Sequence, residues 1–149
     1  MNTTHTLIHA GIAIDNPHQY NVTIGTDIGE FSGTVVCREE DYPHEAKYFG
    51  FELAELKAEI KYARAKRAYY DAELSALTRF WRMMADTRTY KMTDFWVKKM
   101  REEVDKVTIQ RDYWANNIAT LKRHYKDKIV LRDLANKKLT QTKKRMVTE

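Results

Sequence analysis

Apolar side chains recur alternately three and four positions apart through almost all of the second two-thirds of this chain. Two runs follow this rule, with a break near residue 90 between them. The first run is Phe49, Leu53, Leu56, Ile60, Ala63, Arg67, Tyr70, Leu74, Leu77, Trp81 and Met84. The second run is Val97, Met100, Val104, Val107, Arg111, Trp114, Ile118, Leu121 and Tyr125. Because the spacing averages about 3.5 residues, each run predicts one apolar seam on a long, gently supercoiling helix.

The first of these helices has a clear start signal. Acidic residues at 39–41 suit the positive N-terminal end of a helix, and Pro43 is well tolerated in its first turn. We therefore expect this helix over residues 43–86. Gly50 is its weak position and favours either a kink or a start near residue 51.

The second helix follows a short break in the apolar period at residues 86–92. Thr93 can cap this helix, which we expect to continue to the low 140s. Since the connection is short, the helices must be antiparallel neighbours, and the numbers of facing residues add up to about 181. Residues from about 133 onward then have no partner on the first helix and form an overhang.

The N-terminal segment has a different sequence pattern, with short runs of β-branched residues between turn signals. The runs are residues 6–14, 20–24 and 31–37, and they predict a sheet of two or three antiparallel strands. A hairpin alone is marginal in water, so we expect this sheet to cover a helical face. The sequence thus predicts an α+β fold, in which a small N-terminal β-sheet (1–42) packs on a long, coiled-coil-like antiparallel helical hairpin (43–149).

Charge is divided unevenly between these two segments. The net charge is +5. Residues 1–42 hold six acidic residues and one basic residue, whereas the rest of the chain holds 25 basic and 15 acidic residues. This asymmetry favours docking of the sheet on the helices. No membrane span and no positively charged signal-peptide start are recognisable, so we expect a soluble, cytoplasmic protein without a membrane partner.

Two arginines interrupt the apolar seams. The pairing rule places Arg67 opposite Trp114 and Arg111 opposite Tyr70, so each guanidinium can lie on an aromatic face while it reaches Asp71, Asp112 or solvent. The simpler interpretation is that the arginines set register, as polar seam residues do in coiled coils. The alternative is a polar waist that receives an acidic partner.

Aromatic residues off the seam predict a second apolar face, which the sheet, a second copy or another protein would cover. Some of them gather near the hairpin tip, where residue types common in interface hot spots are concentrated. We predict a protein-binding patch there, formed by Phe80, Trp81, Met84, Phe95 and Trp96. The alternative is that these side chains only pack around the turn and on the sheet.

Basic residues near the C-terminus indicate an alternative function, contact with nucleic-acid phosphates through the overhang and the segment before it. Charged tails are usually only solvated, which is the competing interpretation. The candidate residues are Lys122, Arg123, Lys126, Lys137, Lys138, Lys143, Lys144 and Arg145.

Motifs for chemistry are not recognisable. The five histidines have no ligand partners at metal spacing, Cys37 is read as a small buried residue in a strand, and the five glycines form no phosphate loop. We therefore expect a non-enzymatic binding or assembly protein without catalytic residues, metal, cofactor or small-molecule substrate, and with a protein partner or a second copy. Short, basic, helical chains of this kind occur among accessory proteins of phages and mobile elements, but no motif indicates such an origin.

Overall fold

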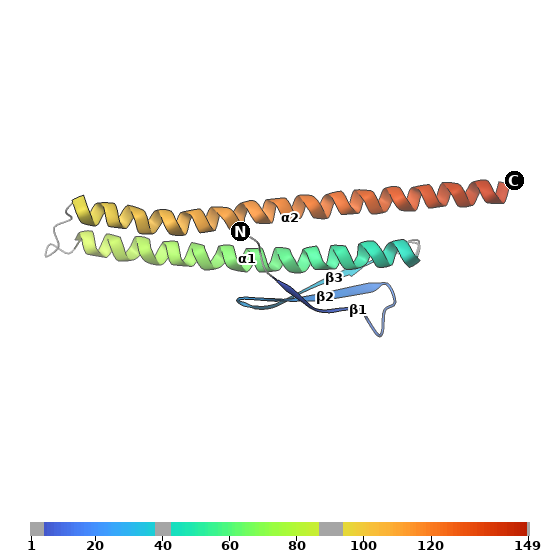
Figure 1. Ribbon diagram of the computed structural model, residues 1–149, viewed down its shortest axis with the longest axis horizontal. Helices are drawn as coiled ribbons and strands as arrows, with labels where there is room; N and C mark the ends of the chain where they lie inside the picture. The colour runs from blue at the N-terminus through green and yellow to red at the C-terminus, as the bar shows by residue number, and fades with distance from the viewer. Residues whose placement is uncertain (1–4, 38–42, 87–93, 149) are drawn as a thin grey trace. The chain divides into compact units, whose positions relative to one another are not determined.

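Three strands precede two long helices in the computed structural model, which describes residues 5–37, 43–86 and 94–148 (Figure 1). Side chains are described at 5–37, 49–86, 94–135 and 137. The elements are β1 Thr6–Ile12, β2 Gln19–Thr26, β3 Gly29–Val36, α1 Pro43–Asp86 and α2 Asp94–Thr148. The predicted α+β fold, with its N-terminal antiparallel sheet and helical hairpin, is confirmed.

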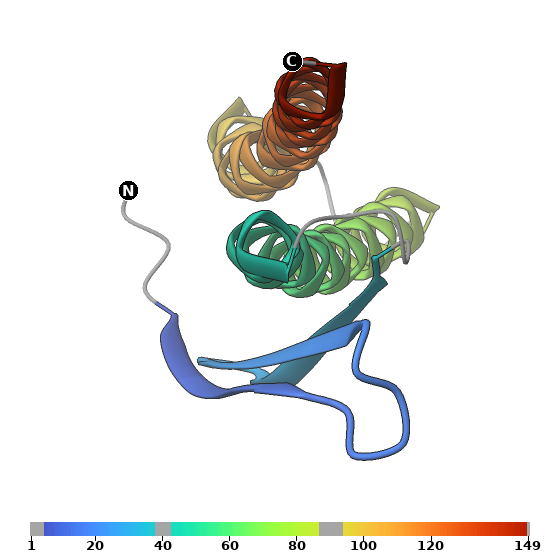
Figure 2. The same cartoon turned by 90° about the vertical axis from the view of Figure 1, so that its right-hand side faces the viewer.

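The chain forms two compact units, and both helices run through both of them. One unit contains residues up to Tyr62 and from Ala119 onward, and the other spans Ala63–Ile118. The sheet therefore shares a unit with the first half of α1 and the second half of α2. In this unit α1 lies between the sheet and α2 (Figure 2).

The sheet has the strand order β1-β2-β3, and both strand pairs are antiparallel. Its buried face comes from alternate residues, because side chains along a strand point to opposite faces in turn. Tyr20, Val22 and Ile24 of β2 and Val35 of β3 are all buried. Strand β1 is an edge strand with a register irregularity between Leu7 and His9, and its large aliphatic side chains are exposed.

Glycine allows the sheet and α1 to approach closely. Gly33 of β3 lies directly over α1, where a Cβ would overlap the carbonyl oxygen of Ala54. On the helix, Gly50 lies under the ring of Tyr20, and a Cβ there would come within 2.6 Å of the ring. Gly50 is thus a packing position, and α1 continues through it from Pro43 without the later start that the sequence suggested.

Contacts between α1 and α2 follow the predicted antiparallel register in each unit. In the first unit, Lys128 Nζ lies 2.7 Å from Glu52 Oε2. In the second unit, Arg111 Nε lies 3.8 Å from Asp71 Oδ1. The residue numbers add up to 180 in the first pair and 182 in the second, close to the expected 181.

The helix ends agree with the sequence at three of four positions. Helix α1 spans Pro43–Asp86 as expected, and α2 begins at Asp94, directly after the predicted cap. The cap itself, Thr93, lies outside the described residues. Helix α2 ends at Thr148 rather than in the low 140s. Within the described residues, neither helix contains a stretch apolar and long enough to cross a bilayer.

The turn between β2 and β3 is tied to α1 by Tyr62, whose hydroxyl donates a hydrogen bond of 2.5 Å to Asp27 Oδ1. We expect Tyr62→Phe to lower the free energy of unfolding by about 1.5 kcal/mol, since a bond to a charged acceptor is lost in a partly buried place. Urea unfolding followed by circular dichroism measures this. Tyr69→Phe removes a hydroxyl from an exposed ring of the same helix and is expected to have little effect. Equal losses in the two variants would contradict the prediction.

Candidate functional site

Aromatic rings near the end of α1 and the start of α2 form a chain of contacts. The ring centroids of Phe80 and Trp81 are 5.3 Å apart, and those of Trp81 and Trp96 are 6.5 Å apart. Phe95 extends the chain, with its centroid 5.5 Å from that of Trp96. Lys99 lies over Trp96 with its Nζ 5.4 Å from the ring centroid, a cation–π arrangement. The structure thus brings together four of the five predicted tip residues.

These residues differ in what they offer to a partner. Trp81 is buried, and Trp96 and Met84 are half-buried. Phe80 and Phe95 are exposed on opposite sides of the break between the helices. The indoles therefore form the packed inner part of the cluster, and the two phenylalanines provide its outward apolar surface.

A second apolar stripe follows α1 in addition to the seam. It begins with Gly50, Ala54, Ala58 and Tyr62, spaced four residues apart on one helical face. The sheet covers these four positions: Gly33 contacts the backbone at Ala54, and Asp27 and Phe31 contact Tyr62. The expectation that the N-terminal sheet covers part of a second helical face therefore agrees with these contacts.

The same stripe continues beyond Tyr62 with the same spacing of three or four residues. Its members begin seven residues, or two turns, after Tyr62 and are Tyr69, Ala72, Ala76, Phe80 and Met83, which we call the open stripe. All five side chains are exposed, and the three large ones have exposed fractions of 59, 46 and 58%. A contiguous row of exposed apolar side chains is more typical of an interaction surface than of a solvated helix face.

The arginines in the seams meet carboxylates, as expected. Arg67 Nε lies 3.8 Å from Asp71 Oδ2, and Arg111 Nε lies 3.8 Å from the other oxygen of the same carboxylate. Arg111 also reaches Asp112 at 3.1 Å. Lys66 lies over the Trp114 ring, with its Nζ 5.7 Å from the ring centroid. The contacts of Arg111 with Asp71 and of Lys66 with Trp114 join the two helices and suit a role in setting their register.

The basic residues of the nucleic-acid prediction fall in two groups. Lys122, Arg123, Lys126 and Lys137 are exposed on α2. The remaining four have side chains outside the described residues: Lys138, Lys143, Lys144 and Arg145. Contact between this segment and phosphate stays a prediction.

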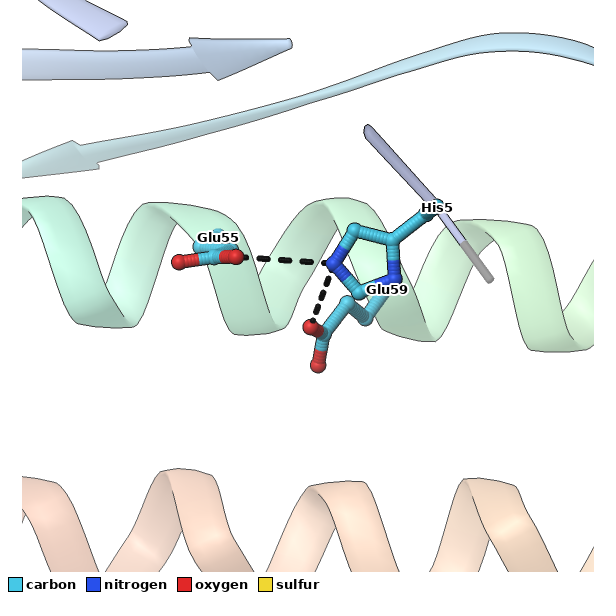
Figure 3. A group of neighbouring side chains, drawn as sticks. All are labelled: His5, Glu55 and Glu59. Atoms are coloured by element: carbon cyan, nitrogen blue, oxygen red, sulfur yellow. Dashed lines mark hydrogen bonds and ion pairs between the residues drawn. The ribbon is translucent and has the colours of Figure 1, made fainter. Parts of the chain in front are cut away.

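A further group of polar side chains lies in the first unit, where His5 meets two glutamates of α1 (Figure 3). His5 Nε2 is 3.5 Å from Glu55 Oε1 and 3.1 Å from Glu59 Oε1. One ligand atom from each residue lies within 4.8 Å of the other two, and all three side chains are partly buried. Glu55 and Glu59 are one turn apart on the same face of the helix, which aims both carboxylates at the imidazole.

A cavity of about 230 Å³ adjoins these glutamates. Its lining residues are Glu52, Glu55, Leu56, Glu59, His124 and Lys128. Burial raises the pKa of Glu59 above its ordinary value, while His5 lowers it, Glu55 raises it further and His124 lowers it. Water therefore solvates the Glu59 carboxylate poorly, and burial is the largest influence on its pKa.

The His5 group differs from the sequence-based expectation that the histidines lack metal-ligand partners. The imidazole is separated from Glu55 by 50 positions, so no local spacing connects them. Only the pair Glu55 and Glu59, at i and i+4 of a predicted helix, was visible as a local signal. That signal is weak, because acidic residues at this spacing are common on solvated helix faces.

Comparison with known proteins identifies no relative: no protein-family model, no curated protein and no solved structure matches this chain.

Proposed function

We propose that this chain is a non-enzymatic assembly protein, which associates with a second copy of itself through the open stripe of α1. The observation that carries the proposal is the row of five exposed apolar side chains that continues a stripe covered by the sheet in the first unit. Apolar surface of this extent costs free energy in water, and its burial would stabilise an assembled state.

A second copy suits the open stripe because the stripe is self-complementary in size. Ala76 lies at its middle, with large side chains toward both ends. If two stripes cross antiparallel about Ala76, Phe80 of one copy lies at the level of Ala72 of the other, and Met83 lies at the level of Tyr69. Phe80 then meets a small side chain on either side of the axis, as where helices pack closely, while Met83 and Tyr69 pair two large apolar side chains at the ends of the stripe. The interface is isologous, as in most homodimers.

The aromatic contacts near the end of α1 and the start of α2 also favour this arrangement. Phe80 belongs both to the open stripe and to the aromatic contacts, and Trp81 next to it is buried against Trp96. A side chain whose neighbours are packed loses less conformational freedom on binding, which favours Phe80 as an anchor.

Replacing Ala76 with glutamate tests the proposal, because the dyad would bring two carboxylates together in an apolar interface. We expect the wild-type chain to dimerise and Ala76→Glu to weaken dimerisation at least about thirtyfold, which corresponds to about 2 kcal/mol. Sedimentation equilibrium over a range of concentrations measures both constants. Ala85→Glu is the matched control, since this alanine is also exposed on α1 but points away from the stripe.

Three outcomes would contradict the proposal. The wild-type chain could stay monomeric up to about 100 μM, which limits the association free energy to about 5.5 kcal/mol. The Ala85→Glu control could dissociate the dimer as strongly as Ala76→Glu. Dimerisation could also survive Ala76→Glu unchanged, in which case copies associate through another surface.

A further inference from the structure

We propose that His5, Glu55 and Glu59 form a binding site for a divalent transition-metal ion of the zinc type. The site lies in the first unit, whereas the open stripe lies in the second, so the proposal is independent of the proposed self-association. It concerns the side chains drawn in Figure 3, which come from the residue before β1 and from two successive turns of α1.

The distances between the donor atoms match what such an ion requires. A tetrahedral zinc ion with bonds of about 2.1 Å holds its ligand atoms about 3.4 Å apart. His5 Nε2 lies 3.5 Å from one carboxylate oxygen and 3.1 Å from the other, with all three donor atoms within 4.8 Å of one another. Small rotations of the glutamate side chains therefore suffice to close the site around an ion.

The chemistry of the donors selects the class of ion. Imidazole nitrogen suits zinc and its neighbours among the transition metals, whereas magnesium and calcium prefer all-oxygen sites. One histidine with two carboxylates leaves a position for a further ligand, as in zinc sites with three protein ligands. His124 lines the same cavity as Glu55 and Glu59, so a second imidazole borders that cavity.

The charges around the site favour a cation. Glu55 and Glu59 place two partly buried carboxylates within 4.8 Å of each other and of the imidazole, an arrangement that a cation would stabilise. Lys128 is the nearby cation among the cavity residues, but its ammonium pairs with Glu52 at 2.7 Å. A bound divalent ion would compensate the two carboxylates directly while His5 stays neutral.

Metal binding at this site would anchor the N-terminal strand. His5 immediately precedes β1, an edge strand whose large aliphatic side chains are exposed. The strand therefore has little side-chain burial of its own to hold it, and an ion bridging its start to α1 would add a cross-link between the sheet and the helix.

Titration calorimetry of the full chain, without any added histidine tag, tests the site with ZnCl2 as the probe. We expect one saturable zinc site per chain and no saturable binding of MgCl2. His5→Asn and Glu59→Gln should each weaken zinc binding at least about tenfold, because each removes a ligand. His9→Asn and Glu102→Gln remove the same groups from exposed positions and should leave the affinity unchanged.

Thermal unfolding supplies a second readout that does not depend on the calorimeter. Zinc should raise the midpoint of the wild-type chain but not those of His5→Asn and Glu59→Gln, and circular dichroism without zinc shows whether these variants are folded. A protonated His5 that only pairs with the two carboxylates predicts instead that no saturable zinc binding occurs. That result, or equal zinc affinity in the wild-type chain and the two ligand variants, would overturn the proposal.

Discussion

Replacing Gly33 with alanine is expected to lower the free energy of unfolding by about 3 kcal/mol or more, the larger of the two largest effects that we predict. The new Cβ would overlap the carbonyl oxygen of Ala54 and come within 2.7 Å of the backbone nitrogen of Ala58. Both atoms belong to the backbone of α1, which cannot move aside as a flexible side chain can. The sheet and the helix would have to separate, and the buried residues between them would lose contact.

Gly11→Ala is the matched control for this prediction. It is the same substitution in the same sheet, but the nearest atoms to its Cβ belong to the imidazole of His9, which is exposed and free to rotate. Both substitutions restrict the unfolded chain equally, so the difference between them isolates the contact with the helix. Urea unfolding followed by circular dichroism gives the two free energies. Losses that agree within about 0.5 kcal/mol would show that β3 does not pack on α1 as closely as described.

Much of the fold was predictable because its signals are local and repeated. The heptad spacing predicts two long helices, and the short break between them predicts their antiparallel pairing. Contacts such as Lys128 with Glu52 follow the expected register. The β-branched runs between turn signals predict the sheet, whose three strands begin and end within two residues of the expected positions. Each of these features depends on residues close together in the sequence.

The close approach of the sheet to α1 was not predictable, because it depends on glycines whose role is set by distant partners. Gly50 looks like a weak point of α1 when only helix propensity is considered. In the fold it accepts the ring of Tyr20, and Gly33 meets Ala54 in the same way from the sheet. The sequence alone does not show whether a glycine ends a helix or allows another element to pack closely against it.

The candidate sites also combine features that the local sequence predicts with features that depend on the folded chain. The second apolar face was predictable from off-seam residues such as Tyr69, Phe80 and Met83, which are exposed. The part of that face that the sheet covers was not predictable, because it depends on where β3 crosses α1. The proximity of His5 to Glu59 was also hidden, because it arises only when the chain returns along α1 after three strands.

The second large effect is expected at Leu53, a seam residue of α1 with no exposed surface. We expect Leu53→Ala to lower the free energy of unfolding by about 3 kcal/mol, since the lost burial and the cavity left behind both destabilise the folded state. Far-UV circular dichroism during urea unfolding measures this. Tryptophan fluorescence would report only on the other unit, because Trp81, Trp96 and Trp114 all lie between Ala63 and Ile118.

Leu134→Ala separates the loss of burial from the change in helix propensity. It replaces the same residue type in the same kind of element, but half of the Leu134 side chain is exposed (51%). Propensity changes by the same small amount at both sites, so a loss at Leu53 that exceeds the loss at Leu134 by about 2 kcal/mol measures the packing of the seam. If the two losses are equal, Leu53 does not lie in a close-packed core. The seam would then be an apolar stripe without the interlocking contacts that its heptad spacing predicts.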